Sequence, residues 1–533
     1  MNYFFLELIK PIIVSFFIII LREWINQTPQ DLTNLKPTTR NKHMNEIKTL
    51  GELKKSGYQS KTIKEELRAN LVKKLQNKEQ VFEGILGFDD TVLPDMERAI
   101  LSRHNILLLG LRGQAKTRIA RLLVHLLDEY IPVVEGSELN DDPLNPISRL
   151  AVDLIETHGD STPISWLHRS ERYVEKLATP DVSVADLIGD VDPIKAATLK
   201  LPYSDERVLH FGLVPRAHRS LFVINELPDL QARIQVSLFN ILQEGDIQIR
   251  GFKLRLPLDI QFVFTANPED YTNRGSIITP LKDRIESQIL THYPRTIETA
   301  RQITQQEASL AEGQAERVNI PDLVEILLEK ISFSARESEF IDEKSGVSAR
   351  LSISAYENLI STAERRALIN KESTTTTRIT DFWGVVPAIT GKVELVYEGE
   401  QEGPYVVAMS LLGKALKELF LSHFPDPDKL QKGRESDPYG TIRAWFSGGN
   451  TVDLLNDSSN EDYKKALDTV AGLRKFTEKH TKTSGEESYV YMELVLHGLV
   501  EFDILNKDVM QSSMSFRDLL ANMLDDDIFG DLN

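Results

Sequence analysis

The chain has 533 residues, enough for two to four domains, and a formal net charge of −18. It contains no cysteine, which excludes disulfides, thiolate nucleophiles and cysteine-based zinc sites. The acidity argues against non-specific nucleic-acid binding, which needs a basic surface to neutralise phosphates.

The first 43 residues form an apolar segment followed by a polar linker. Residues 3–22 are strongly apolar, although Glu7 and Lys10 interrupt the first half. A membrane span needs about 20 apolar residues, and charges near its centre are costly. The polar, helix-prone segment that Met44 opens favours translation from that residue; a membrane anchor and a peripheral helix are the alternatives. A membrane is expected as a partner only if residues 3–22 are an anchor.

An apolar run from Asn105 to Leu109 leads into a polar loop and then into Lys116 and Thr117, with apolar residues at helical spacing beyond. This pattern is typical of a phosphate-binding loop, where main-chain N–H groups and a helix N-terminus attract an anion. Lys116 is expected to reach the β- and γ-phosphates and Thr117 to hold Mg²⁺. The residues predicted to bind the nucleotide are Gly110, Leu111, Arg112, Gly113, Gln114, Ala115, Lys116 and Thr117.

Ala115 departs from the usual loop, in which a second glycine stands at this position. Alanine costs little there if its φ is negative and more if its φ is positive.

After residues 135–179, which we interpret as an insertion, a second apolar strand begins at Ser220 and ends in Asn225 and Glu226. The carboxyl ends of parallel strands meet at one edge of an α/β sheet, where such folds bind ligands. Glu226 is therefore expected to polarise the water that attacks the γ-phosphate. Asn225 stands where an aspartate normally supports the Mg²⁺ shell, so the predicted metal residues are Thr117 and Asn225.

The neutral amide at position 225 leaves two expectations open. If Asn225 faces the metal shell, an aspartate should hold Mg²⁺ more tightly, because a unit charge about 4 Å from the ion is worth several kcal/mol at an effective dielectric of about 20. If the site is built around the amide, for example with Asn225 donating to a neighbouring carbonyl, the aspartate variant should be less stable or less active.

A third apolar strand begins at Ile260 and ends in Asn267, an amide suited to orienting the attacking water. Between the second and third strands, alternation after residue 245 predicts a β-hairpin with its turn at Gly251. Arg284 follows the third strand, and Arg350 precedes a long helical run.

Taken together, these residues resemble the AAA+ ATPases, within the group of the magnesium chelatase I subunit and MoxR-like proteins. The resemblance covers roughly residues 80 to 365 and rests on the segments 110–117, 211–226, 264–269 and 280–284. It implies an α/β fold: an AAA+ P-loop core with a parallel sheet, an α-helical lid and a mostly helical C-terminal region.

The resemblance also implies a role for each site residue. Lys116 and Thr117 belong to the Walker A motif, and Glu226 is the Walker B carboxylate. Asn267 is sensor 1. Arg284 is an arginine finger that acts on the ATP of a neighbouring subunit, and Arg350 is sensor 2. The implied cofactors are ATP and Mg²⁺.

Five regions are expected along the chain. They are an N-terminal segment (1–43), a helical extension (44–80), the α/β core (81–298), the lid (299–372) and a mostly helical C-terminal domain (373–533) with an acidic tail. The best helices predicted in the last region cover residues 406–420, 463–476 and 488–504.

Two functions follow as expectations. The first is a cytoplasmic ATP-hydrolysing motor, a ring because an arginine finger acts in trans, and by resemblance a hexamer that remodels a partner with a von Willebrand A domain. The second is a nucleotide-gated scaffold with weak turnover, which Ala115 and Asn225 allow. A sigma-54-type transcriptional activator would need a Gly-Ala-Phe-Thr-Gly-Ala-like loop and a helix-turn-helix, and the sequence shows neither. Chelatase activity would need a porphyrin-binding subunit that this chain does not contain.

Overall fold

The computed structural model describes residues 47–202, 205–248, 255–268, 276–430, 437–510 and 513–518. Residues 3–22, the turn at Gly251 and the acidic tail lie outside these ranges. By internal contacts the chain divides into two units. The first combines residues up to 60 with 130–167, and the second combines residues 61–129 with the rest from 168 onward.

The first unit joins a short N-terminal helix to a segment far along the chain. Helix α3 (Leu50–Lys55) begins with a capping box between Thr49 and Glu52. The other elements are β2 (Tyr130–Val134), α7 (Arg149–His158), η3 (Gly159–Ser161) and β3 (Ile164–His168), and β2 pairs with β3. Most of the stretch that we interpreted as an insertion belongs to this unit.

The core of the second unit is a parallel sheet in the order β11-β1-β10-β7-β4. Its strands are β1 (Ile106–Leu109), β4 (Tyr173–Leu177), β7 (Ser220–Asn225), β10 (Ile260–Ala266) and β11 (Ser287–Leu290). Every residue of β1, β7 and β10 is buried, as in strands covered on both faces. The strand that leads into the predicted phosphate loop, β1, therefore lies inside the sheet, next to β10, which Asn267 follows.

Strand β4 corrects the interpretation of residues 135–179 as an insertion. Strand β4, which forms the last part of that segment, pairs in parallel with β7, and Leu177 lies opposite Asn225. The strand is only half-buried and carries Glu175 and Lys176. It therefore lacks the continuous apolar run that marks the central strands, and the sequence pattern missed it.

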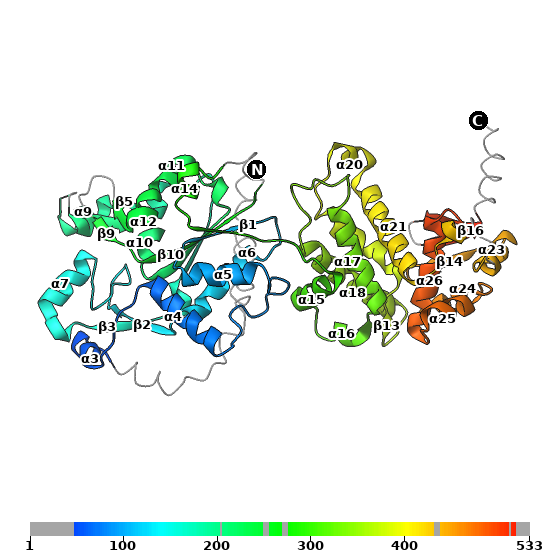
Figure 1. The fold of residues 1–533 in the computed structure, drawn as a ribbon, viewed down its shortest axis with the longest axis horizontal. Helices are drawn as coiled ribbons and strands as arrows, with labels where there is room; N and C mark the ends of the chain where they lie inside the picture. Colours follow the sequence, from blue (N-terminus) through cyan, green and yellow to red (C-terminus); the bar gives the residue numbers. More distant parts are fainter. Residues whose placement is uncertain are drawn as a thin grey trace, which may run out of the picture. The chain divides into compact units, whose positions relative to one another are not determined.

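Helices α4 (Ile63–Gln76), α5 (Val92–Leu101) and α6 (Lys116–Leu122) share one buried apolar cluster with β1, β7 and β10. Figure 1 shows these helices, in blue, beside the sheet. Residues 63–76, which the sequence assigned to an N-terminal extension, thus lie in the core.

Short elements complete the α/β core. They are η2 (Leu123–Leu126), η4 (Arg169–Arg172), α8 (Val184–Leu187), β5 (Gly189–Val191), α9 (Pro193–Leu199), η5 (Glu206–Val208), β6 (Leu209–Phe211), α10 (Leu213–Arg216), η6 (Leu227–Asp229), α11 (Ala232–Ser237), α12 (Phe239–Glu244), β8 (Asp246–Gln248), β9 (Arg255–Pro257) and α14 (Thr279–Lys282). Strands β8 and β9 pair antiparallel, with Asp246 opposite Pro257, where the sequence predicts a hairpin.

The region that the sequence predicts as a lid (residues 299–372) shares a single buried apolar cluster with the C-terminal region, running from Val318 to Phe516. The elements of the predicted lid are α15 (Ile297–Glu307), α16 (Gln314–Arg317), β12 (Val318–Asn319), α17 (Asp322–Arg336) and α18 (Arg350–Ile369), and β13 (Thr375–Thr376) follows them. The C-terminal region contains η7 (Ile379–Val385), α19 (Val386–Thr390), α20 (Tyr397–Glu402), α21 (Pro404–His423), α22 (Pro427–Leu430), α23 (Gly440–Ser447), β14 (Val452–Leu455), α24 (Asn460–Asp468), α25 (Leu473–Thr481), α26 (Glu486–Glu501), β15 (Leu505–Met510) and β16 (Ser513–Asp518).

The helix predicted over residues 463–476 is two helices in the structure. Helix α24 ends at Asp468 and α25 begins at Leu473, after Gly472 with a φ of +83°. Gly472 is the residue just before α25, and its left-handed conformation, which glycine adopts at little cost, interrupts the helical pattern between the two helices.

The predicted α/β fold class is confirmed: the chain has an α/β core with a parallel sheet, followed by a helical C-terminal region. Within the described ranges, no helix combines the length and the apolarity that a membrane crossing requires.

Candidate functional site

The loop between β1 and α6 folds tightly around its own main chain. A Cβ atom on Gly110 would lie 1.9 Å from Thr291 Oγ1 and 2.2 Å from Gln114 Oε1, so only glycine fits there. Those two neighbours are joined by a hydrogen bond of 2.7 Å from Thr291 to Gln114. The Gly110 N–H donates to the carbonyl of Ala266, the last residue of β10. The loop is thereby fixed to the neighbouring strand.

Lys116 is buried, with 8% of its surface exposed. Its ammonium group donates to the carbonyl of Gly110 and, at 2.9 Å, to that of Leu111. The lysine therefore folds back over the loop at the N-terminus of α6. An ammonium group held in this way by main-chain carbonyls is suited to bind phosphate oxygens, because a charged acceptor makes the stronger hydrogen bond.

Ala115 adopts the unfavourable one of the two conformations considered from the sequence. Its φ is +54° and its ψ is 14°, in the left-handed region. This conformation costs a residue with a Cβ roughly 1–2 kcal/mol.

We expect Ala115→Gly to raise the free energy of unfolding by about 0.5–1 kcal/mol, because the strain is relieved while glycine loses more backbone entropy on folding. Thermal melting measures the change. Ala120→Gly, the same substitution inside α6, serves as the control and should lower stability. An unchanged or lower melting temperature for Ala115→Gly would contradict the strain argument.

The predicted lid contacts the loop just before the start of α18. Gly113 has a φ of +73°, and a Cβ there would lie 2.1 Å from Ser348 Oγ. Arg112, which we predicted among the nucleotide-binding residues, forms an ion pair with Glu394, and its carbonyl accepts a hydrogen bond of 2.9 Å from Tyr293. In this conformation the Arg112 side chain thus contacts the segment that follows the lid.

Asn225 connects the loop to the strand ends. Its Oδ1 accepts hydrogen bonds from Thr117 at 3.4 Å and from Thr265 at 3.0 Å. Its Nδ2 donates to Glu175 Oε1 at 2.6 Å. The amide therefore donates to a neighbouring acceptor, which is a carboxylate and not the carbonyl considered from the sequence.

Glu226 and Asn267 lie at the ends of β7 and β10, which are neighbours in the sheet. The main-chain N–H of Glu226 donates to Thr265 Oγ1 at 3.2 Å, and its φ of +54° and ψ of +50° are left-handed. Asn267 is 3% exposed, and its Oδ1 is buried without a hydrogen-bond partner among the described residues. A buried amide oxygen in this state favours a bound donor, such as a water molecule.

The two predicted arginines are not hydrogen-bonded to the loop within the described ranges. Arg284 donates to Gln243 Oε1 at 2.9 and 3.1 Å and to the Pro280 carbonyl at 2.7 Å. Its guanidinium group lies 4.9 Å from the centre of the Phe239 ring. Arg350 is the exposed first residue of α18, and its N–H donates to Ser348 Oγ. Arg350 thus lies two residues after Ser348, the side chain that lies against Gly113.

The sequence analysis missed two residues of this network, Thr265 and Glu175. Thr265 precedes Asn267 by two positions in β10, so alternation along the strand was a usable signal. Glu175 comes from β4, and nothing local to its sequence predicts that it meets Asn225.

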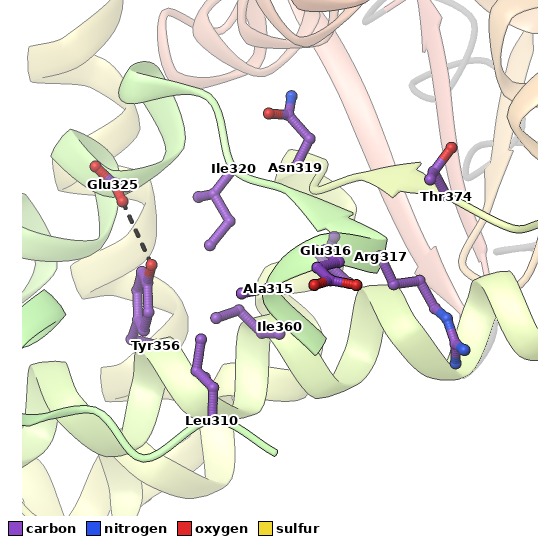
Figure 2. A pocket seen from close by; sticks show the side chains of 11 residues that line it. Leu310, Ala315, Glu316, Arg317, Asn319, Ile320, Glu325, Tyr356, Ile360 and Thr374 are labelled. Atoms are coloured by element: carbon purple, nitrogen blue, oxygen red, sulfur yellow. Dashed lines mark hydrogen bonds between the residues drawn. The ribbon is translucent and has the colours of Figure 1, made fainter. Parts of the chain in front are cut away.

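Two cavities lie away from this network. Figure 2 shows one of about 410 Å³ in the lid, where Tyr356 hydrogen-bonds Glu325 at 3.5 Å. Arg301 already holds that carboxylate at 2.5 Å, which offsets its charge. The other cavity, of about 600 Å³, is lined by Asn105 and Ile260 at the amino ends of β1 and β10. That is the opposite edge from the one where α/β sheets bind ligands.

No family model matches the chain. Among solved structures the chain is similar to NtrX from Brucella abortus, at 15% identity and a TM-score of 0.32, covering 55% of this chain and 54% of NtrX. It thus spans about half the length of that protein. It is also similar to the complex of BchI and BchD of magnesium chelatase, at 21% identity and a TM-score of 0.31, covering 60% and 98%. A third similarity is to Hsp104 with ATPγS and casein, at 12% identity and a TM-score of 0.35, covering 63% and 52%.

Proposed function

We propose that this protein binds ATP with Mg²⁺ and hydrolyses it. The observation that supports this is the chain of hydrogen bonds from Thr117 through Asn225 and Thr265 to the main chain of Glu226. It connects the phosphate loop to the ends of two neighbouring strands, where the carboxylate, amide and hydroxyl groups of a nucleotide hydrolase are needed.

The residues present fit such a ligand. The loop surrounds a buried ammonium group, and Asn267 offers a buried acceptor that has no partner in the described part of the chain. Thr117 and Asn225 present oxygen atoms, the ligand type that Mg²⁺ prefers. Thr117 would hold the ion, which neutralises charge on the phosphates, and Asn225 would support its water shell. Glu226 is then the group that orients and polarises the attacking water.

Steady-state ATP hydrolysis by the purified full chain tests the proposal. We expect phosphate release that depends on Mg²⁺ and that clearly exceeds the release by the Lys116→Ala variant. Release equal to that of the variant, with nucleotide still bound, would favour the scaffold described below.

We propose further that the protein forms a homo-oligomeric ring, by resemblance a hexamer, in which Arg284 acts on the nucleotide of a neighbour. Arg284 is half-buried on its own subunit and binds Gln243 there, within the described residues. A guanidinium group that does not reach its own loop is available to reach the next subunit. The client is a partner protein, by resemblance one with a von Willebrand A domain.

Mixing two inactive variants tests the shared site. Arg284→Ala subunits retain Lys116, and Lys116→Ala subunits retain Arg284, so mixed rings contain some complete interfaces. We expect partial recovery of ATPase activity, because an arginine finger can be worth roughly 10³–10⁵ in rate by analogy with GTPases. The signal should be modest, since only a minority of interfaces is complete.

Two controls accompany the mixing experiment. Gln243→Ala removes the partner of Arg284 but keeps the guanidinium group, and it should remain active. Mixing Lys116→Ala with the Lys116→Ala/Arg284→Ala double variant yields no complete interface and should show no recovery. The absence of recovery in rings that are shown by mass to be mixed would mean that Arg284 does not act in trans.

A nucleotide-gated scaffold with weak turnover is the second candidate. The strained Ala115 and the neutral Asn225 favour it, because both depart from the residues usual in rapid hydrolases of this fold. It predicts tight, Mg²⁺-dependent ATP binding with slow phosphate release.

A further inference from the structure

The carboxylate of Glu175 is held by four hydrogen bonds beside the predicted metal site. Arg121 donates twice, at 3.0 Å to Oε2 and at 3.2 Å to Oε1. Tyr173 donates to Oε2 at 2.9 Å, and Asn225 Nδ2 donates to Oε1 at 2.6 Å. Burial raises the pKa of the Tyr173 phenol, and the nearby Glu175 charge raises it further, so Tyr173 stays a neutral donor. The carboxylate is therefore fixed in position by groups on three elements.

Glu175 determines which atom of Asn225 faces the loop. An ionised carboxylate can only accept hydrogen bonds, so the amide must turn its Nδ2 toward Glu175. Its Oδ1 is then directed at Thr117 and Thr265. Without this partner either end of the amide could face the Thr117 hydroxyl, which both donates and accepts.

The charge of Glu175 is only partly offset by Arg121. The Arg121 side chain is 63% exposed, whereas that of Glu175 is 23% exposed. Water screens the more exposed charge more strongly, so the pair as a whole leaves negative potential on the side of Asn225. The amide between Glu175 and Thr117 is polarised in the sense that makes Oδ1 a stronger acceptor.

We propose that Glu175 is a positioning residue for Mg²⁺-nucleotide binding: from the neighbouring strand β4 it supplies the negative charge that position 225 lacks, and it acts through the Asn225 amide. The inference rests on the proposed function and deepens it. The acidic partner of the predicted metal site thus stands on β4, one strand further along the sheet than Asn225.

The first test is Glu175→Gln, which keeps the shape and removes the charge. We expect the Mg²⁺ concentration for half-maximal binding of a fluorescent ATP analogue to rise about 10-fold or more, as is usual when a group behind a metal ligand is removed. Glu171→Gln is the matched control, because Glu171 is an exposed acid just before β4 and its substitution changes the net charge equally. It should leave the Mg²⁺ midpoint unchanged.

The second test exchanges the two groups. Asn225→Asp alone places two carboxylates in direct contact, which should lower the melting temperature of the metal-free protein. The double variant Glu175→Gln/Asn225→Asp restores the hydrogen bond between the two side chains with donor and acceptor exchanged, although the Arg121 bond to Oε1 is lost because an amide nitrogen takes that position. We expect it to recover most of the melting temperature lost in Asn225→Asp and to bring the Mg²⁺ midpoint to the wild-type value or below. The coupling between the two sites is read from this cycle.

The outcomes separate the inference from the proposed function. If wild type binds the analogue with Mg²⁺ and folded Glu175→Gln has the midpoint of Glu171→Gln, the role of Glu175 is wrong and the proposed function stands. If Glu175→Gln/Asn225→Asp recovers neither the melting temperature nor the Mg²⁺ midpoint, the proposed role of Glu175 is again wrong. If wild type binds no analogue at any Mg²⁺ concentration, both fail. The melting temperatures of wild type, the two single variants and the double variant are measured without nucleotide. They therefore report on the contact between Glu175 and Asn225 whether or not the protein binds ATP.

Discussion

Lys116→Ala should lose most of the affinity for ATP while the fold persists. Lys116 is buried at the start of α6, and its ammonium group lies on the carbonyls of the phosphate loop. Hydrogen bonds to a charged group contribute about 1.5–3 kcal/mol each, so the loss should be on the order of 10- to 100-fold in affinity. Binding of a fluorescent ATP analogue measures it, with circular dichroism to show that the variant is folded.

Two controls make this result specific. Lys116→Met keeps most of the side-chain volume and should lose affinity to the same extent, which excludes a packing effect. Lys479→Ala removes a positive charge from an exposed position on α25 and should bind as wild type does. Unchanged affinity in folded Lys116→Ala would mean that this loop does not hold the phosphates.

The central strands and the residues at their ends were predictable because one local pattern carries both. In β1, β7 and β10 a continuous apolar run indicates a strand that is buried on both faces. The residue after each run then lies at the carboxyl edge of the parallel sheet. Asn225 and Asn267 could therefore be placed at one edge without knowing how the strands are ordered.

Strand β4 and Glu175 were not predictable in the same way. The strand lies at the edge of the sheet and is half-buried, so polar residues interrupt its apolar pattern. That Glu175 meets Asn225 depends on the pairing of two strands separated by more than 40 residues, and no local pattern encodes such a register.

The backbone conformation of single residues could not be predicted from the sequence either. The sequence shows that Ala115 replaces a glycine, but whether this is costly depends on its φ, which the surrounding loop determines. The same holds for Gly472, where a left-handed residue divides a continuous helical pattern into α24 and α25. In both cases tertiary context selects one of two locally allowed conformations.

Glu226→Gln should bind ATP with wild-type affinity and hydrolyse it about 10²- to 10⁴-fold more slowly, the range expected when a general base is removed. The residue is held at the end of β7 by its main-chain hydrogen bond to Thr265, in a left-handed conformation. Such strain in a residue with a side chain is tolerated where the surrounding structure fixes it, often at functional sites. Glutamine has the same shape and adopts the same backbone, so binding is retained while the charge that polarises water is lost.

Paired measurements of nucleotide affinity and phosphate release test this expectation, and the oligomer should accumulate in its ATP-bound form. Glu171→Gln provides the same change in net charge at an exposed position outside the strand ends and should hydrolyse ATP as wild type does. Because Glu226 and Asn225 are adjacent, a loss of Mg²⁺ binding would also slow hydrolysis. The Mg²⁺ midpoint of Glu226→Gln must therefore stay near that of wild type for the slow rate to be assigned to the missing base. Hydrolysis at the wild-type rate would show that another group polarises the water, and Glu226 would then be only the end of a strand.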